Sequence, residues 1–442
     1  MIVRVRHWAD RWQSPERHRH LDALLRDQAL SAAQLRTKQA DDLAAMLRHA
    51  RECVPFYRAR DREIPLDGDV HEVLRRLPIL RKDDVARDPD ALLDERADRS
   101  TVRIAHTGGS TGQPLAYYYD RHKHELMRAG MMRSYMFSGW RPGERILNFW
   151  GARQDVKPRG LRKRIGDVIA AERTIGAYEV TEAGLARWVD TIRRYRPVLL
   201  QGYASILAEL ARHVADTGAQ LPATLKGVYS TAEVLHDHQR ALMESAFGCK
   251  VFNQYGSREI PNIACECRHG NLHVFTDMVY LETVREDGED KLLVTSLTNR
   301  LMPFIRYDIG DSASLKDGRC PCGLPFPLLE MGVCRSNDLI RTRAGKVVYP
   351  SYFIHLLDGL QGIRQYRFVQ TAADRMTLDL VAAQPLPTDV AAALAARIRE
   401  DVDPDMALEI RYVHAVPRTR SGKHRFVVRD MGDPAAARSV LR

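Results

Sequence analysis

The sequence predicts an α/β protein with a large N-terminal domain built on parallel sheets, an antiparallel subdomain and a small α+β domain. Between residues 115 and 253, short apolar runs alternate with amphipathic helical patterns, an order typical of parallel sheets. From residue 274 onward, apolar strands are joined by polar turns, which favours antiparallel pairing. The 442 residues also exceed what one hydrophobic core usually serves, so we expect at least two domains.

The first half of the chain supplies the helices and the parallel strands. Residues 1–52 are expected to be helical, because leucines and a methionine recur there at helical spacing. The strands expected in the main body are 115–119, 145–151, 197–203, 226–230 and 251–253, and the helices are 122–137, 204–215 and 236–247. Ligands of such folds bind at the carboxyl ends of the strands, where Trp150, Tyr203, Ser230 and Tyr255 fall.

The second half changes character twice. The antiparallel strands are expected at 279–284, 291–295 and 304–307, and a later group of strands at 365–370, 376–382 and 409–413, with a helix over 387–401. We therefore expect a large domain of residues 1–335, with a helical segment at 1–52 and a β-rich subdomain at 274–335. A small domain of residues 336–442 follows.

The composition is that of an ordinary globular protein, with 45% hydrophobic and 28% charged residues. No run of 18 apolar residues predicts a transmembrane helix, and the first residues lack the apolar core of a signal peptide, so a cytoplasmic location is expected. The net charge of +10 favours small polyanions as partners, and the arginines are scattered rather than gathered in a tail that would indicate nucleic acid. Seven cysteines, an odd number, do not predict a disulfide framework.

The segment from His106 to Pro114 carries three glycines and three hydroxyl side chains. Glycine lets backbone N–H groups approach an anion closely, and hydroxyls add donors, so this loop can hold phosphates. It is not a P-loop, because no Lys-Ser or Lys-Thr pair follows the last glycine. An ordinary turn is the plainer alternative.

Three further segments follow in a fixed order, namely 253–259, 306–311 and 420–423. With the loop, the motifs Tyr-Gly-Ser-Arg-Glu, Arg-Tyr-Asp and Ser-Gly-Lys resemble those of the adenylate-forming superfamily over about residues 45 to 430. The closer resemblance is to the phenylacetate–CoA ligase branch, which includes CapK-type proteins of polysaccharide gene clusters. Its motifs are similar to Val54–Tyr57 and Cys320–Gly323 as well.

The resemblance implies a role for each motif. The loop residues that would hold the β- and γ-phosphates of ATP are Thr107, Gly108, Gly109, Ser110, Thr111 and Gly112. The residues that would line the adenine of ATP or AMP are Ser230, Ala232, Glu233, Tyr255 and Gly256. Glu259 would hold Mg²⁺, Asp311 would accept from the ribose hydroxyls, and Arg335 would add a donor. Lys423 would be the catalytic cation that offsets charge between the carboxylate and the α-phosphate.

Each of these residues also has a plainer interpretation. Glu259 alone would be a glutamate at the start of a surface helix, Asp311 a turn residue after Gly310, and Lys423 one lysine of a basic stretch. The chain also departs from the family pattern, with Gln113 where a lysine is common and Asn337 at the position about which a mobile C-terminal lid would pivot. Arg258 stands where many relatives carry threonine or a small residue.

A second group of residues is typical of a metal site. Cysteines and histidines gather in 265–273 and again in Cys320-Pro321-Cys322. The favoured zinc ligands are Cys267, His273, Cys320 and Cys322, with Cys265 or His269 in reserve. Four protein ligands leave no open position, so such a zinc would be structural. Reduced, buried cysteines without metal are the alternative.

The leading hypothesis for function is an ATP-dependent, AMP-forming acid–CoA ligase with magnesium and CoA as further cofactors. Trp150, Tyr203 and Tyr229 would suit an aryl or arylacetic acid if they line its pocket, but they could equally be core residues. One alternative passes the acyl group to an amine, a carrier protein or a sugar. Another is a catalytically inactive scaffold that binds nucleotide and zinc. The sequence leaves the acid, the acceptor and a homodimer open.

Overall fold

The computed structural model describes residues 2–60, 68–107, 115–150, 171–177, 180–286, 289–335, 340–343, 346–348, 352–353, 356–357, 360, 362–419 and 423–430. Of residues 289, 333–335, 341 and 347 it describes the backbone alone. The chain forms two compact units. The larger unit is made of Met1–Gly109, Pro114–Ile309 and Ala313–Glu330, and the smaller of Ser110–Gln113, Gly310–Ser312 and Met331–Arg442.

Helices begin the larger unit, as the leucine spacing predicts. They are α1 (Ile2–Gln13), α2 (Pro15–Gln28), α3 (Ala32–Cys53), α4 (Pro55–Arg60), α5 (Val70–Arg76) and α6 (Lys82–Arg87), followed by a short 3₁₀ helix, η1 (Asp90–Leu92). Ser31 starts α3 through a capping box with Gln34, in which each side chain accepts from the other residue's backbone N–H. No described helix combines the length and the apolar character that crossing a bilayer requires.

A nine-stranded sheet forms the body of the larger unit, in the order β13-β14-β9-β8-β7-β6-β5-β3-β4. Its parallel half contains β3 (Ile146–Trp150), β4 (Glu172–Gly176), β5 (Leu199–Tyr203), β6 (Gly227–Thr231) and β7 (Val251–Tyr255). The other strands are β8 (Ala264–Glu266), β9 (Leu272–Val274), β13 (Asp311–Lys316) and β14 (Leu328–Arg335). β8, β9 and β14 pair antiparallel, so the sheet changes character after β7.

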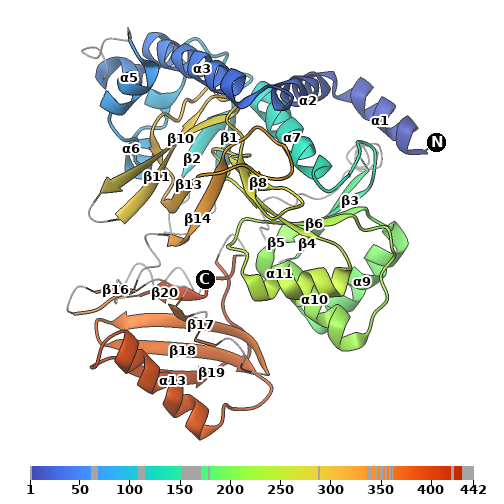
Figure 1. Cartoon of the computed structure of the whole chain (residues 1–442), viewed down its shortest axis with the longest axis vertical. Helices are drawn as coiled ribbons and strands as arrows, with labels where there is room; N and C mark the ends of the chain where they lie inside the picture. The colour runs from blue at the N-terminus through green and yellow to red at the C-terminus, as the bar shows by residue number, and fades with distance from the viewer. Residues whose placement is uncertain are drawn as a thin grey trace. The chain divides into compact units, whose positions relative to one another are not determined.

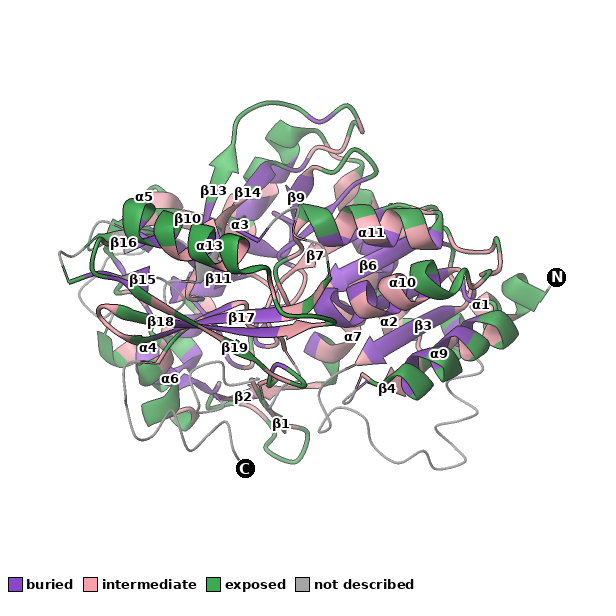
Figure 2. Ribbon diagram, turned by 90° about the horizontal axis from the view of Figure 1, so that it is seen from below, coloured by how far each residue is buried: buried purple, intermediate pink, exposed green. Residues whose placement is uncertain are grey.

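Helices α7 (Arg121–Met136), α9 (Glu182–Tyr195), α10 (Ala204–Thr217) and α11 (Asp237–Phe247) accompany the parallel strands. In Figure 2, α9, α10 and α11 each have a more buried side and an exposed side, and strands β3 and β6 near them are largely buried. The core between them contains Leu147, Phe149, Leu200 and Trp188. Because apolar side chains lose contact with water there, this packing is a main source of stability for the sheet.

Two smaller sheets complete the larger unit. β1 (Arg103–His106) pairs antiparallel with β2 (Ala116–Tyr119), so the phosphate-loop segment joins two paired strands. β10 (Val279–Glu286), β11 (Glu289–Ser296) and β12 (Tyr307–Asp308) form the antiparallel subdomain, as predicted.

The smaller unit contains a four-stranded sheet in the order β19-β18-β17-β20. Its strands are β17 (Ile363–Ala372), β18 (Arg375–Ala382), β19 (Ala407–Tyr412) and β20 (Val427–Arg429), with helix α13 (Thr388–Asp401) (Figure 1). Phe368, Leu378 and Ile398 are fully buried between helix and sheet. A short pair, β15 (Ile340–Arg341) and β16 (Val347–Val348), precedes them.

The predicted fold class is confirmed, since strands, helices and the change to antiparallel pairing fall where the hydrophobic pattern places them. Nine of the described strands, β1, β4, β8, β9, β13, β14, β15, β16 and β20, were not predicted. β8, β9, β15, β16 and β20 are only two or three residues long, and β1, β4 and β13 are largely polar, so these strands lack the apolar run by which a strand is recognised. β14 contains several apolar residues and was missed.

Candidate functional site

Glu259 is the centre of a buried polar group in the larger unit. Its side chain comes from the loop after β7 and the residue is only 4% exposed. The hydroxyl of Tyr307, itself fully buried, donates to Oε1 of Glu259 across 3.1 Å. Two motifs that are 48 residues apart, Tyr-Gly-Ser-Arg-Glu and Arg-Tyr-Asp, therefore meet at one carboxylate.

Lys123 lies beside this carboxylate and was not predicted from the sequence. Its Nζ donates to the backbone carbonyl of Glu259 across 2.5 Å and lies 4.9 Å from the ring centroid of Tyr117. Burial lowers the pKa of Lys123 to about 8, although the nearby carboxylates of Glu259 and Asp120 act in the opposite direction. In the sequence Lys123 is one of four successive basic residues, 121–124, a pattern that indicates an exposed helix face.

A tight turn holds Glu259 in place. The N–H of Ser257 donates to the carbonyl of Ile260 at 2.9 Å, and the Ser257 hydroxyl accepts from the N–H of Ile260 at 3.0 Å. A Cβ on Gly256 would lie 3.0 Å from the backbone nitrogen of Asn262. Glycine is thus favoured by this close approach of backbone to backbone, since a larger residue would press on the Asn262 backbone.

Arg258 links the same turn to the phosphate-loop segment. Its guanidinium donates to the carbonyl of His106, the last residue of β1, across 3.1 Å. At Thr107 the backbone N–H donates to the carbonyl of Leu115, and the Thr107 hydroxyl accepts from the Leu115 N–H at 2.9 Å. Thr107 therefore closes the base of the loop. The predicted phosphate ligands Gly108, Gly109, Ser110, Thr111 and Gly112 lie outside the described residues.

The carboxyl end of β6 combines three features typical of a binding edge. The Ser230 hydroxyl is buried without a hydrogen-bond partner in the described part of the chain. Ala232 has a φ of 70°, a left-handed conformation that is unfavourable for alanine. The carboxylate of Glu233 accepts from the N–H of Ser205 at 2.8 Å, so this side chain satisfies the start of α10.

The aromatic residues considered for the acid pocket divide into two groups. Tyr229 is a core residue, because it is fully buried, stacks on Phe252 and donates its hydroxyl to the carbonyl of Ser134 at 2.7 Å. Trp150 and Tyr203 form an edge-to-face pair with centroids 5.2 Å apart at the ends of adjacent strands β3 and β5. Trp150 is partly exposed, so it alone of the three can offer much of its surface to a ligand.

Arg306 of the Arg-Tyr-Asp motif has a structural role. It has a φ of 50°, its Nε contacts the Glu282 carboxylate at 3.2 Å, and its guanidinium donates to the carbonyls of Arg75 and Leu77. Burial raises the pKa of Glu282, while the Arg306 charge opposes that shift. Arg306 thus fixes the segment whose next residue, Tyr307, reaches Glu259.

The remaining predicted residues lie in segments grouped with the smaller unit, which include the first two residues of β13 and the end of β14. Asp311 begins β13 directly after Gly310, whose φ is 79°. Arg335 ends β14, and its side chain lies outside the description. Lys423 is held by a turn in which its N–H donates to the Thr419 hydroxyl at 3.0 Å and its carbonyl accepts from the Thr419 N–H at 2.9 Å. Asn337, at the expected pivot, is not described.

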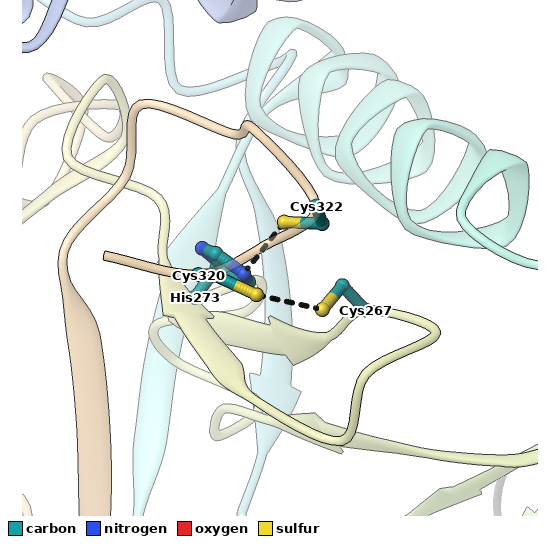
Figure 3. A group of neighbouring side chains, drawn as sticks. All are labelled: Cys267, His273, Cys320 and Cys322. Carbon is teal, nitrogen blue, oxygen red and sulfur yellow. Dashed lines mark hydrogen bonds between the residues drawn. The ribbon is translucent and has the colours of Figure 1, made fainter. Parts of the chain in front are cut away.

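The structure brings together the four favoured metal ligands, Cys267, His273, Cys320 and Cys322. Their donor atoms all lie within 4.8 Å of one another (Figure 3). The Sγ atoms of Cys267 and Cys320 are 3.5 Å apart, and Nε2 of His273 is 3.3 Å from Sγ of Cys322. The ligands come from the turn after β8, from β9 and from the loop between β13 and β14. The reserve candidates Cys265 and His269 are not members of this group.

Cys267, His273, Cys320 and Cys322 are called the thiol cluster below, and the groups around them suit a thiophilic cation. His273 directs Nδ1 to the carbonyl of Phe326 at 3.2 Å, which leaves Nε2 for a metal. Backbone N–H groups point at the sulfurs of Cys267 and Cys322, and the Asn271 amide lies 3.2 Å from Sγ of Cys320. Burial raises the pKa of Cys267 and that of Cys322, the latter to about 12, and lowers the pKa of His273. Thiolates in such surroundings are costly unless a cation is bound.

Helix α7 contacts both the turn at Glu259 and the surroundings of the thiol cluster. Lys123 stands in its first turn, and Arg133, ten residues later, is fully buried. The Arg133 guanidinium pairs with Asp277 and lies 4.1 and 5.2 Å from the ring centroids of Phe275 and Phe326. Phe326 is the residue whose carbonyl orients His273.

The fold defined by these elements is that of the adenylate-forming ligases. The structure of 2-hydroxyisobutyryl-CoA ligase, solved in the postadenylation state in complex with R3-HIB-AMP, superposes with a TM-score of 0.72 and 20% identity over 93% of both chains. Such a likeness establishes the architecture and leaves the reaction to be argued from the site.

Proteins with similar sequences indicate which branch of the adenylate-forming ligases this chain resembles. Protein CapK of Staphylococcus aureus is 23% identical over 369 residues, which are 81% of this chain and 80% of CapK. The phenylacetate–coenzyme A ligase of Thermus thermophilus is 27% identical over 343 residues, 73% of this chain and 75% of the ligase. Residues 340–430 match the family of CapK C-terminal domains. The resemblance to the phenylacetate–CoA ligase and CapK branch is thereby confirmed.

Proposed function

We propose that the protein is an AMP-forming ligase that activates a carboxylic acid with ATP and passes the acyl group to CoA. The observation that supports this most directly is the meeting of the Tyr307 hydroxyl, the Lys123 ammonium and Glu259 at one buried turn. The relatives named phenylacetate–coenzyme A ligase add support, since the chain covers about three quarters of their length.

In this proposal Glu259 binds Mg²⁺, because a hard cation prefers carboxylate oxygen and a buried, oriented carboxylate loses little freedom on binding it. Magnesium would supply charge neutralisation at the phosphates. Tyr307 orients the carboxylate, and Arg258 keeps the Glu259 turn against the start of the phosphate loop. The orphaned hydroxyl of Ser230 and the strained Ala232 suit the adenine edge, with Asp311 and Arg335 at the ribose and Lys423 at the developing charge.

The proposed site fits a reaction that must exclude water. An acyl-adenylate hydrolyses if water reaches it, and a carboxylate that is 4% exposed lies in a largely dry environment. Trp150 at the end of β3 offers one aromatic surface for an aryl or arylacetic acid. Because ATP and CoA are cytoplasmic molecules, the proposal places the protein in the cytoplasm.

A second question is which molecule accepts the acyl group, and one observation favours an acceptor other than CoA. The C-terminal domain matches that of CapK, and the similarity to CapK spans more of the chain than that to the ligases. If the acyl group goes to an amine, a carrier protein or a sugar, the smaller unit is where the difference from a CoA ligase is expected.

Pyrophosphate release with a panel of acids, measured with and without CoA, tests these alternatives. Release with formation of acyl-CoA supports the leading proposal, and release without a CoA product supports another acceptor. ATP binding with no release for any acid favours the inactive scaffold.

A variant of the smaller unit tests the catalytic cation. Lys423→Ala should lower pyrophosphate release by about 10² to 10³, the cost of removing one charge-stabilising group. Arg429→Ala removes an exposed positive charge from β20 in the same unit and serves as the matched control. Near-normal release by Lys423→Ala, or an equal loss in both variants, contradicts the role given to Lys423.

We further propose that Cys267, His273, Cys320 and Cys322 bind a structural zinc ion. The support is the approach of the four donors from three separate segments. Three thiolates and one imidazole satisfy zinc fully, so the ion would join these segments and take no part in the reaction.

A further inference from the structure

We propose that helix α1 binds the surface of an anionic lipid bilayer. Four of its large apolar side chains face solvent, with Ile2, Val5, Trp8 and Trp12 exposed by 64, 59, 70 and 79% respectively. At 100° per residue these four positions cover roughly 120° of the helix circumference, so they form one stripe. Two exposed tryptophans within five residues are unusual on a surface that serves only solubility.

The orientation of α1 is unusual, because its apolar stripe faces solvent rather than the core. A surface helix of a globular protein normally turns its apolar face to the core. In α1 the polar side chains face inward instead, because Asp10 is buried and accepts from Nε2 of His18 at 2.8 Å, and the His7 ring packs on that of His18 with centroids 5.2 Å apart. Arg17 of α2 adds an ion pair to Asp10 at 3.5 Å.

Close packing against the body of the unit fixes α1 in this orientation. A Cβ on Gly143 would lie 2.4 Å from the carbonyl oxygen of Val3, so the loop at Gly143 touches the helix backbone. Figure 1 shows α1 beyond the end of α2, at the margin of the larger unit, and Figure 2 shows its outer side exposed. The apolar stripe is therefore held outward by contacts made on the opposite face.

Charge on α1 favours anionic lipid as the occupant. The helix has three arginines, and Arg4 and Arg11 border the stripe on one side. Its single acid, Asp10, is turned inward and neutralised. Arg11 shares an exposed ion pair with Asp22, a contact worth little in water. Tryptophans on an apolar face with arginines at its border are the pattern of a helix that lies in the bilayer interface.

A second copy of the chain fits the stripe less well. A stable protein interface buries about 800 Å² per partner and uses about 20 to 30 residues a side, which four side chains on a 12-residue helix do not approach. Pairing α1 with itself would also bring its arginines together. The inference does not depend on the proposed reaction, because no residue of α1 belongs to the ligase site.

Vesicle flotation of the full-length protein tests this inference. Wild type should float with mixed phosphatidylcholine–phosphatidylglycerol vesicles, less at high salt and little with pure phosphatidylcholine. The double variant Trp8→Ser/Trp12→Ser should bind the mixed vesicles about tenfold or more weakly. Leu315→Ser, which removes a 52% exposed side chain from β13, is the matched control and should float like wild type.

Several results would overturn the inference. They are equal flotation of wild type and the double variant, absence of wild-type binding, and equal binding to neutral vesicles. A wild-type dimer that the double variant dissolves, without vesicle binding, would assign the stripe to a second copy instead. Both tryptophans are exposed, so a matching circular dichroism spectrum is expected for the variant and shows that the comparison is between folded proteins.

Discussion

The group around Glu259 and the thiol cluster solve the same physical problem in opposite ways. Both bury groups that prefer to be charged, and Glu259 and Cys267 both come from the segments that follow β7. At Glu259 the chain itself supplies the partners, since the Tyr307 hydroxyl donates to the carboxylate and the Lys123 ammonium donates to the backbone carbonyl of the same residue. At Cys267, His273, Cys320 and Cys322 the described contacts to the sulfur atoms come from backbone N–H groups, from the Asn271 amide and from other members of the cluster.

The comparison indicates how far the Glu259 carboxylate and the thiol cluster each depend on a bound ligand for their arrangement. A carboxylate with an internal partner is oriented before any ligand arrives, so the magnesium proposed there would bind with little rearrangement. Thiols without a cation hold their loops weakly, so the thiol cluster would contribute most to stability with the proposed zinc bound. The first arrangement suits chemistry and the second suits cross-linking.

The largest effect we expect is on catalysis at the carboxylate. Glu259→Gln keeps the shape and removes the charge, and pyrophosphate release should fall by about 10². Release is measured under saturating ATP at several magnesium concentrations. Glu172→Gln is the control, because Glu172 of β4 is a partly buried carboxylate that is paired with Arg128 of α7, and its loss should change stability rather than the rate. An unchanged rate of pyrophosphate release in Glu259→Gln would contradict the catalytic role proposed for Glu259.

The next effect concerns metal and thermal stability. The purified protein should contain about one zinc per chain, and Cys267→Ser should lose it and unfold several degrees lower. Pyrophosphate release per folded molecule should change little. Cys265→Ser alters a neighbouring buried thiol outside the cluster and should keep the metal. Wild-type protein with only a small fraction of an equivalent of zinc would contradict the assignment.

A smaller effect is the pH dependence that Lys123 gives to stability. Its pKa is about 8 in the folded protein and 10.5 in the unfolded chain, so between these values the unfolded state binds more protons. The free energy of unfolding should therefore rise with pH across this window, by on the order of 2 to 3 kcal/mol at most.

Lys123→Met should lack this rise, whereas Lys250→Met, which removes an exposed lysine, should keep it. Chemical denaturation at pH 8 and pH 10 measures both. Parallel curves for wild type and Lys123→Met would mean that Lys123 is not held in a dry environment in solution.

The sequence was a good guide to the fold class and to local motifs, and a poor guide to short strands and to contacts between motifs. The four thiol-cluster ligands could be chosen because each lies in a short Cys/His-rich segment. The contact of Arg258 with His106 spans 152 residues and that of Lys123 with Glu259 spans 136, so both depend on which strands the sheet makes neighbours. No spacing rule reaches that far. Strand order is decided by burial and crossover geometry rather than by residues near the contact.

Several residues with a predicted ligand role also make structural contacts that sequence patterns do not reveal. Gly256 is favoured by the approach of Asn262, and Glu233 satisfies the first turn of α10. A motif residue can serve backbone geometry and ligand binding together, and its type alone does not separate the two.

Helix α7 gives the larger unit a property that neither polar group has alone. Lys123 and Arg133 are separated by ten residues, about 15 Å of one rigid helix. One meets the carbonyl of Glu259, and the other packs on the ring of the residue that orients His273. A sideways shift or a rotation of this single helix would therefore disturb both places at once, so the loops of the thiol cluster and the turn that holds Glu259 are mechanically linked although they share no residue.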